Sequence, residues 1–136
     1  LQSVTLDTGA VVDASYMFSG CSSLQSVTLD TGAVTSASQM FYGCSSLQSV
    51  TLDTGAVVDA SYMFYGCSSL QSVILTGLTR GVSVANASLS STALDALYTS
   101  LGTAAGSQTI TVSGNYGTTG DNPSIATGKG WTISGS

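Results

Sequence analysis

The chain has 136 residues, which is enough for one domain with a hydrophobic core. Its charged side chains are seven Asp, Arg80 and Lys129, and the net charge of −5 argues against nucleic acids and anionic membranes as partners, because phosphates attract clustered Lys and Arg. No apolar run approaches the ~20 residues that span a bilayer, and the N-terminus lacks the pattern of a signal peptide.

The first half of the chain repeats a unit of 23 residues. Three nearly identical copies occupy residues 1–23, 24–46 and 47–69, and a divergent fourth copy begins at Leu70 as "LQSVILTG". A period of this length is typical of solenoids, in which each repeat forms one coil and buries its apolar face against its neighbours. We therefore predict an α/β repeat solenoid with a parallel ladder of short strands.

Each repeat divides into a strand, a turn and a return segment. "LQSVTLD" predicts a strand with Val4 and Leu6 on the inner face and Thr5 on the outer face, and "DTG" predicts a turn. The return segment supplies the other inward-facing residues, Val11, Met17, Phe18 and Cys21. Equivalent residues of neighbouring coils should stack about 4.8 Å apart. Two apolar rows are expected, Leu6/Leu29/Leu52/Leu75 and Phe18/Phe41/Phe64.

Few positions vary among the three copies, and all of them lie on the return segment. They are Val12/Thr35/Val58, Asp13/Ser36/Asp59, Tyr16/Gln39/Tyr62 and Ser19/Tyr42/Tyr65. The last three sets are spaced by three residues, which predicts one exposed face of a short helical turn on the convex side of the coil.

The repeats are predicted to span residues 1–88, and residues 89–136 to form a helical C-terminal cap of the same solenoid, since terminal repeats are atypical. A helix should begin at a Ser90 or Ser91 cap and stop at Gly102. The remaining elements are a strand with Ile110 and Val112 inward, a compact helix starting at Pro123 and a last strand at Trp131.

One strand per coil predicts six parallel rungs in a single row. The rungs would start at Val4, Val27, Val50, Val73, Ile110 and Trp131. The longest step, from Val73 to Ile110, would house the helix. The alternative is a short antiparallel hairpin between Val73 and Val84 around "TGLTRG".

The recurring "MFxGCSSLQSVTL" resembles the hallmark of the BspA-like leucine-rich repeat surface proteins, over roughly residues 1–75. The resemblance implies a curved leucine-rich-repeat solenoid located on cell surfaces or on the tail and fibre proteins of phages. It also implies a role in adhesion and recognition, without identifying a ligand.

Catalytic and metal-binding patterns are lacking in the sequence. Without His or Glu, the chain has no Ser-His or Cys-His pair and no Glu–Asp acid–base pair, so we predict no enzyme activity, no cofactor and no metal site. Cys21, Cys44 and Cys67 are too few ligands for a structural zinc site. We expect buried free thiols, with disulfides as the alternative.

Asp7, Asp30 and Asp53 form a further row, at the turn of each repeat. Solvated turn residues are the favoured interpretation, because Asp-x-Gly is common turn chemistry. Calcium is the alternative, since it would accept carboxylate oxygens stacked in this way.

The composition and the resemblance together predict a non-enzymatic extracellular recognition, adhesion or display module, within a bacterial surface adhesin or a phage tail or virion appendage. The expected location is extracellular, on a cell or virion surface. The expected partner is a host-cell surface protein or glycan, or neighbouring subunits, with no nucleic acid and no membrane insertion. The alternative is a purely structural spacer or assembly subunit. Because the chain starts at Leu1 on a repeat boundary, we expect it to be a piece of a longer protein.

The candidate recognition surface combines the varying aromatic positions with a loop of the cap. Its residues are Tyr16, Tyr42, Tyr62, Tyr65, Asn115, Tyr116, Asp121 and Asn122. The tyrosines could stack on sugars, although ordinary packing over the convex shoulder is the competing interpretation. The outer face of the strands, Thr5/Thr28/Thr51, is expected to be bland.

Overall fold

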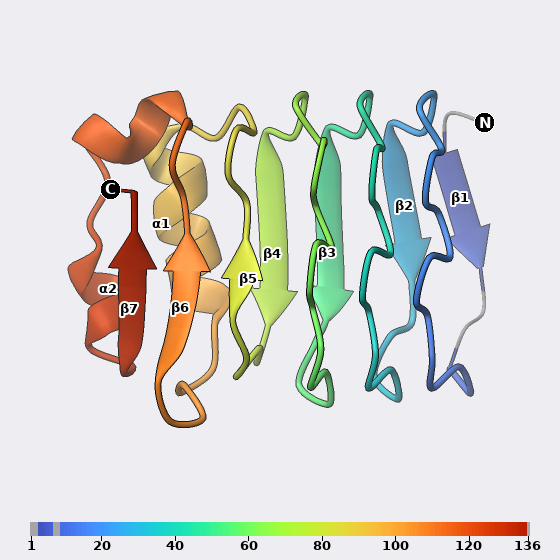
Figure 1. The fold of residues 1–136 in the computed structure, drawn as a ribbon, viewed down its shortest axis with the longest axis horizontal. Coiled ribbons are helices and arrows are strands. Elements are labelled where there is room, and N and C mark those ends of the chain that lie inside the picture. The colour runs from blue at the N-terminus through green and yellow to red at the C-terminus, as the bar shows by residue number, and fades with distance from the viewer. Residues whose placement is uncertain (1–2, 7–8, 136) are drawn as a thin grey trace.

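A computed structural model describes residues 3–6 and 9–135 as an elongated stack of coils (Figure 1). Four short strands lie side by side in one parallel sheet, which we call the strand wall: β1 (Ser3–Leu6), β2 (Ser26–Leu29), β3 (Ser49–Asp53) and β4 (Ser72–Thr76). The pairing is in register, so that Val27 lies beside Val50 and Val50 beside Val73. The predicted parallel ladder is confirmed.

The return segments form a second ladder on the opposite side of the coil. We call residues 13–20, 36–43 and 59–66, together with the strands that follow them on this side, the return wall. The amides of Ala14, Tyr16, Phe18 and Gly20 donate to carbonyls of the second segment, and those of Ala37, Gln39, Phe41 and Gly43 donate to the third, all at 2.7–3.0 Å. Main-chain bonds therefore join the first three coils along both walls.

The predicted short helical turn on this segment is wrong. Tyr16, Gln39 and Tyr62 have left-handed φ angles of 63°, 56° and 56°, which a right-handed helix excludes. The segment is instead a series of tight turns, because Met17 donates to Ala14 and Ser19 to Tyr16 within the coil while alternate amides reach the next coil.

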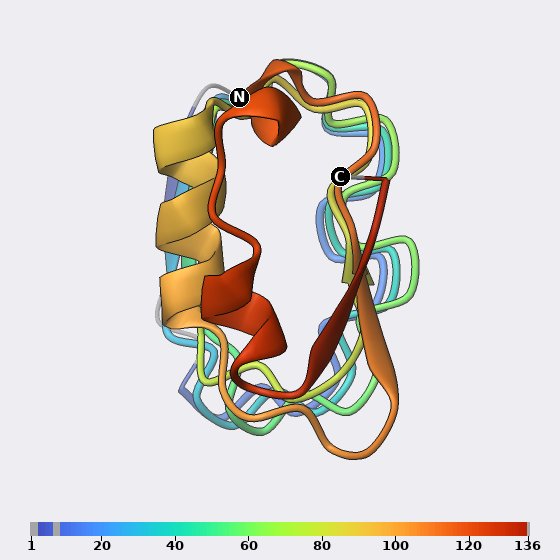
Figure 2. The same cartoon turned by 90° about the vertical axis from the view of Figure 1, so that its left-hand side faces the viewer.

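Side chains of the two walls meet in a continuous apolar core. Figure 2 shows the backbone of the two walls facing each other, viewed along the length of the stack. The phenylalanine row is confirmed: the rings of Phe18 and Phe41 stack at 5.6 Å, and those of Phe41 and Phe64 at 5.8 Å. Leu29, Leu52 and Leu75 are buried in the strand row, whereas the side chain of Leu6 lies outside the described residues.

The prediction of six rungs in one row is wrong. The strands β5 (Val82–Ser83), β6 (Gln108–Thr111) and β7 (Trp131–Ser134) form a second parallel sheet, located on the return wall (Figures 1 and 2). The helix α1 (Ser91–Ser100) takes the place beside β4 on the strand wall. Ser100 accepts the Gly77 amide through its carbonyl at 2.9 Å and the Leu75 amide through its hydroxyl at 3.1 Å. The antiparallel hairpin is also wrong, because β5 pairs with β6 in parallel.

The cap contains the expected helices. Ser90 caps α1 by accepting the Ala93 amide at 3.1 Å, and Leu94, Leu97 and Tyr98 are buried. A 3₁₀ turn η1 (Tyr116–Thr119) precedes α2 (Ser124–Thr127), which begins one residue later than expected. Among the helices of the described residues, none is long and apolar enough to cross a membrane.

The sequence did not reveal how the end of α1 is held. Lys129 Nζ donates to the carbonyls of Tyr98, Thr99 and Leu101 at 2.7–3.1 Å. A cation at this position satisfies the last carbonyls of the helix and opposes the negative end of its dipole.

The stacked phenylalanine row should dominate stability. Phe41→Ala is expected to lower the free energy of unfolding by about 3–5 kcal/mol, since the substitution leaves a large cavity between two rings. Thr51→Ala, on the exposed face of β3, is the control and should change it by no more than about 0.5 kcal/mol. Urea denaturation followed by circular dichroism measures both. A loss of unfolding free energy below roughly 1 kcal/mol for Phe41→Ala would show that Phe41 is not part of the core.

Candidate recognition surface

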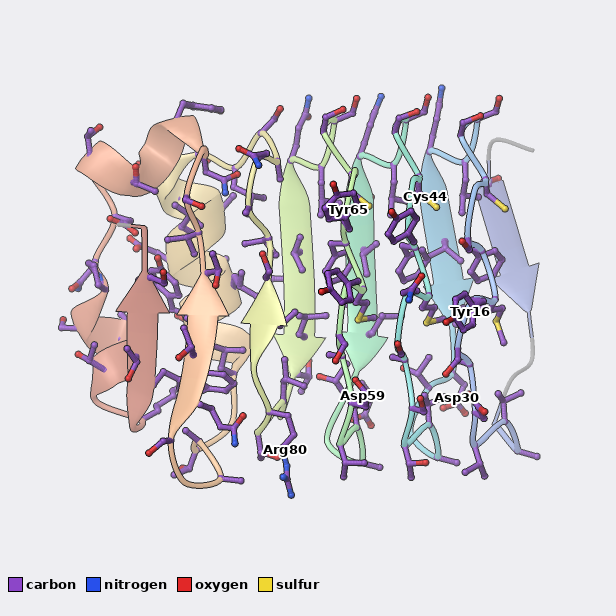
Figure 3. All side chains as sticks on the ribbon, in the orientation of Figure 1. Tyr16, Asp30, Cys44, Asp59, Tyr65 and Arg80 are labelled. Carbon is purple, nitrogen blue, oxygen red and sulfur yellow. The ribbon has the colours of Figure 1, made fainter. Side chains whose placement is uncertain are left out.

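Four tyrosines of the predicted surface lie exposed on the return wall. We call Tyr16, Tyr42, Tyr62 and Tyr65 the tyrosine ridge; their side chains are 58%, 37%, 62% and 58% exposed. The rings of Tyr42 and Tyr65 stack at 4.9 Å, and Tyr62 meets Tyr65 edge to face at 6.2 Å. Figure 3 shows Tyr16 and Tyr65 on this wall. The structure therefore brings Tyr42, Tyr62 and Tyr65 together in one aromatic cluster.

The backbone of the return wall holds the ridge in an outward position. Tyr16 and Tyr62 adopt a left-handed conformation that costs a non-glycine residue free energy. The ladder holds Tyr16 in this conformation, because the Tyr16 amide donates to the Ser38 carbonyl at 3.0 Å. Gln39, at the same position of the middle coil, donates from its side chain to the Tyr16 hydroxyl at 3.3 Å.

Carboxylates beside the ridge are separated by the variation between repeats. Asp13 pairs with Ser36, and Ser36 with Asp59, so a serine lies between the two acids. Hydrogen bonds from Ser15 and Ser61 lower the pKa of Asp13 and Asp59, respectively. Both carboxylates are therefore ionised at neutral pH and avoid direct stacking of like charges.

A groove opens beside the ridge, between the third return segment and the second sheet. Its volume is about 660 Å³, and no charged side chain lines it. The third return segment contributes Tyr62 and Tyr65 to its lining, and the second sheet contributes Ser83, Thr109 and Thr111. The sequence reasoning missed this feature, because it placed all six predicted strands in one row and so did not predict a second sheet beside the third return segment.

Asn115, in the cap loop of the predicted surface, is buried and holds the fold together. Asn115 is only 4% exposed; its side chain accepts the Leu89 amide at 2.9 Å and donates to the carbonyls of Val84 and Val112 at 2.9 and 3.0 Å. Asn115 therefore joins three segments of the fold and is not available at the surface.

The other cap candidates lie at the C-terminal end of the stack, away from the tyrosine ridge on the first three coils (Figure 1). Tyr116 is exposed. Asp121 accepts the hydroxyl of buried Tyr98 at 2.7 Å, and the Asn122 amide donates to Asp95 at 2.6 Å. The structure thus does not bring the loop and the ridge into one site.

The cysteine row is reduced. Cys21, Cys44 and Cys67 are all free; the last two are buried and Cys21 is half-buried. The thiols of Cys44 and Cys67 donate to the carbonyls of Phe18 and Phe41 at 3.1 and 3.2 Å. Burial raises the pKa of Cys44 to about 11 and that of Cys67 to about 12. The predicted buried free thiols are confirmed for Cys44 and Cys67.

The acidic row serves the turns of the coils. Asp30 and Asp53 each accept an amide two residues ahead, from Gly32 and Gly55, at 3.1 Å. Asp7 lies outside the described residues. Within the part of the chain that the structure describes, no group of three Asp, Cys, Glu or His residues could hold a metal ion.

Comparison with known families gives one match. The model of the BspA type leucine rich repeat region matches residues 1–111 and counts six copies, which extends the likeness well beyond residue 75. No curated protein and no solved structure matches the chain significantly.

The three thiols should differ in their reactivity. We expect iodoacetamide to label Cys21 first at a pH below 9, the ordinary pKa of a thiol. Cys44 and Cys67 should react only slowly, because the pKa values of these two buried thiols are raised in the folded protein. The neutral buried thiols stabilise the fold, and this contribution is lost as the pH rises from about 9 towards 11 and 12. Mass spectrometry of the alkylated native protein measures the order. Equally fast labelling of Cys67 and Cys21 would contradict it.

Asn115 offers a second test of the placement. Asn115→Ala should lower the free energy of unfolding by roughly 2–4 kcal/mol, because the Leu89 amide and two carbonyls lose a buried partner. Tyr116→Ala, at the next residue but exposed, should cost at most about 0.5 kcal/mol. Thermal and urea denaturation compare the two variants; equal losses would place Asn115 at the surface after all.

Proposed function

The chain belongs to the BspA-type leucine-rich repeat family, and on that premise we propose that it is an extracellular recognition module that binds a partner protein through the tyrosine ridge. Domains of this family are typically surface protein-binding modules and are usually non-catalytic. The proposal places the domain in a cell-surface adhesin or a phage tail or virion appendage.

The observation that carries the proposal is the exposed aromatic cluster on the return wall. Tyr42, Tyr62 and Tyr65 contact one another while remaining open to solvent. Tyrosine is enriched in interface cores and among residues that dominate binding energy. Contact between the rings also restricts their rotamers before binding, which reduces the entropy that a partner must overcome.

The opposite wall lacks these features. Its outward residues on β2 and β3 include Thr28 and Thr51, which are exposed and identical between coils. A partner with a non-repeating surface needs different side chains on successive coils, and these occur on the return wall. The uniform strand wall instead favours the second candidate function, a spacer or assembly subunit that packs against copies of itself.

The ridge should carry most of the binding energy. Tyr62→Ala combined with Tyr65→Ala is expected to weaken binding by more than ~2 kcal/mol, because aromatic anchors contribute disproportionately. The control is Thr28→Lys combined with Thr51→Lys on the strand wall, which should bind like the wild type.

The assay measures adhesion of each immobilised variant to intact target cells and to panels of purified surface proteins and glycans. If only the lysine variant loses binding, the binding site lies on the strand wall and not on the tyrosine ridge. If no variant binds any cell, protein or glycan, the spacer function takes precedence.

A further inference from the structure

The ladder of the return wall is interrupted after the third coil. Four amides of this coil, those of Ala60, Tyr62, Phe64 and Gly66, occupy the positions whose counterparts donate to the next segment in the first and second coils. Within residues 9–135, none of these four amides donates a hydrogen bond to the fourth segment or to any other acceptor. A row of unpaired donors therefore faces the groove.

The fourth segment does not continue the ladder because it is bonded elsewhere. Val82 pairs with Ile110 of β6, and the Ser88 amide and hydroxyl donate to Leu70 and Ser68. Figure 2 shows that the third return segment (green) projects farther from the strand wall than β5 and β6 (yellow and orange). The groove thus has the donor row as its side and the two strands as its floor.

The two walls end their ladders differently. On the strand wall Ser100 accepts the amides of Leu75 and Gly77, so α1 covers the end of that sheet. On the return wall the donor row remains open over about 660 Å³. Proteins usually cover unpaired strand edges, because such edges invite pairing with another chain.

We propose that the groove binds a polypeptide segment of the partner, which adds to the return wall as a further segment with the turn conformation of the three return segments. The proposal rests on the proposed function and specifies the form in which the partner is recognised. Alternate carbonyls of the segment accept from the donor row, as the carbonyls of Ser61, Met63 and Tyr65 do for the second coil. Main-chain pairing of an added segment with an open hydrogen-bonding edge is a general mode of peptide recognition.

The chemistry of the lining favours a polypeptide over a glycan. The donors lie at every second residue of a series of tight turns, and in the first two coils the equivalent donors bond to alternate carbonyls of a segment with the same turns. The carbonyls of Ala60, Tyr62 and Phe64 already accept amides within their own coil, so the coil offers donors alone. The lining is uncharged, which fits a segment with small apolar or hydroxyl side chains between Tyr62, Tyr65 and the floor.

Short random peptides displayed on phage are the probe. Peptides selected on the wild-type protein are resynthesised with trans-alkene isosteres, which keep the planar trans geometry of the peptide bond but remove one carbonyl at a time. The expected result is a loss of affinity of about tenfold at alternate positions and little change between them, since each lost acceptor leaves a donor unpaired. Losses without this alternation, a failure to select any peptide, or selective binding of glycans in its place would overturn the proposal.

A matched pair of variants locates the binding. Ser83→Trp fills the floor of the groove and should reduce peptide affinity by more than about tenfold, as expected when several main-chain bonds are blocked. Ser38→Trp adds the same ring to the second coil, where the ladder is intact, and should leave affinity unchanged. Circular dichroism verifies that both variants fold. Equal affinity of the two variants would exclude the groove.

The same variants separate this proposal from the proposed function. If adhesion to cells is lost in the double tyrosine variant but kept in Ser83→Trp, the ridge is the site and the groove is not. If both variants lose adhesion and the selected peptides compete with the cells, both proposals stand. If neither variant loses adhesion, both fail.

Discussion

Main-chain hydrogen bonds between successive coils are the interaction on which the rest of the molecule depends. They place equivalent residues of neighbouring repeats beside one another on both walls, at the spacing of about 4.8 Å between strands. Side chains must then tolerate their own copies as neighbours. Phe and Leu rows do so by stacking in the core, whereas like charges at this distance repel. The position of Ser36 between Asp13 and Asp59 avoids such a contact.

The proposed function depends on where the ladder continues and where it stops. Continuity across three coils brings Tyr42, Tyr62 and Tyr65 into contact on the return wall, so the ridge combines the repeated backbone with the positions that vary between repeats. The break after the third coil exposes unpaired amides next to that ridge, and the helix α1 covers only the strand wall. The return wall therefore combines aromatic side chains with main-chain donors, the two features on which the proposed binding of a partner protein rests.

The sequence predicted the features that repeat and missed those that depend on distant contacts. A strict period implied register, so the Phe18/Phe41/Phe64 row, the parallel pairing and the exposed tyrosines could be derived from one coil. The wall on which the strands of Ile110 and Trp131 lie could not be derived, because their alternating pattern would be the same on either wall. The position of α1 beside β4 on the strand wall determines that these strands lie on the return wall. Asn115 follows a strand and precedes a turn, as a surface Asn would, and its role depends on Val84 and Leu89, which are distant in sequence.

Hydrogen exchange of single amides in the native protein, resolved by NMR, tests the central claim that the return ladder joins three coils and then ends. Ala37, Gln39, Phe41 and Gly43 donate to the third coil and should exchange slowly, whereas Ala60, Tyr62, Phe64 and Gly66 should exchange much faster. The two sets occupy equivalent positions of neighbouring repeats, so local sequence differs little between them. Equal protection of the two sets would contradict the account, because the ladder would then continue into the fourth coil and no open row of donors would exist.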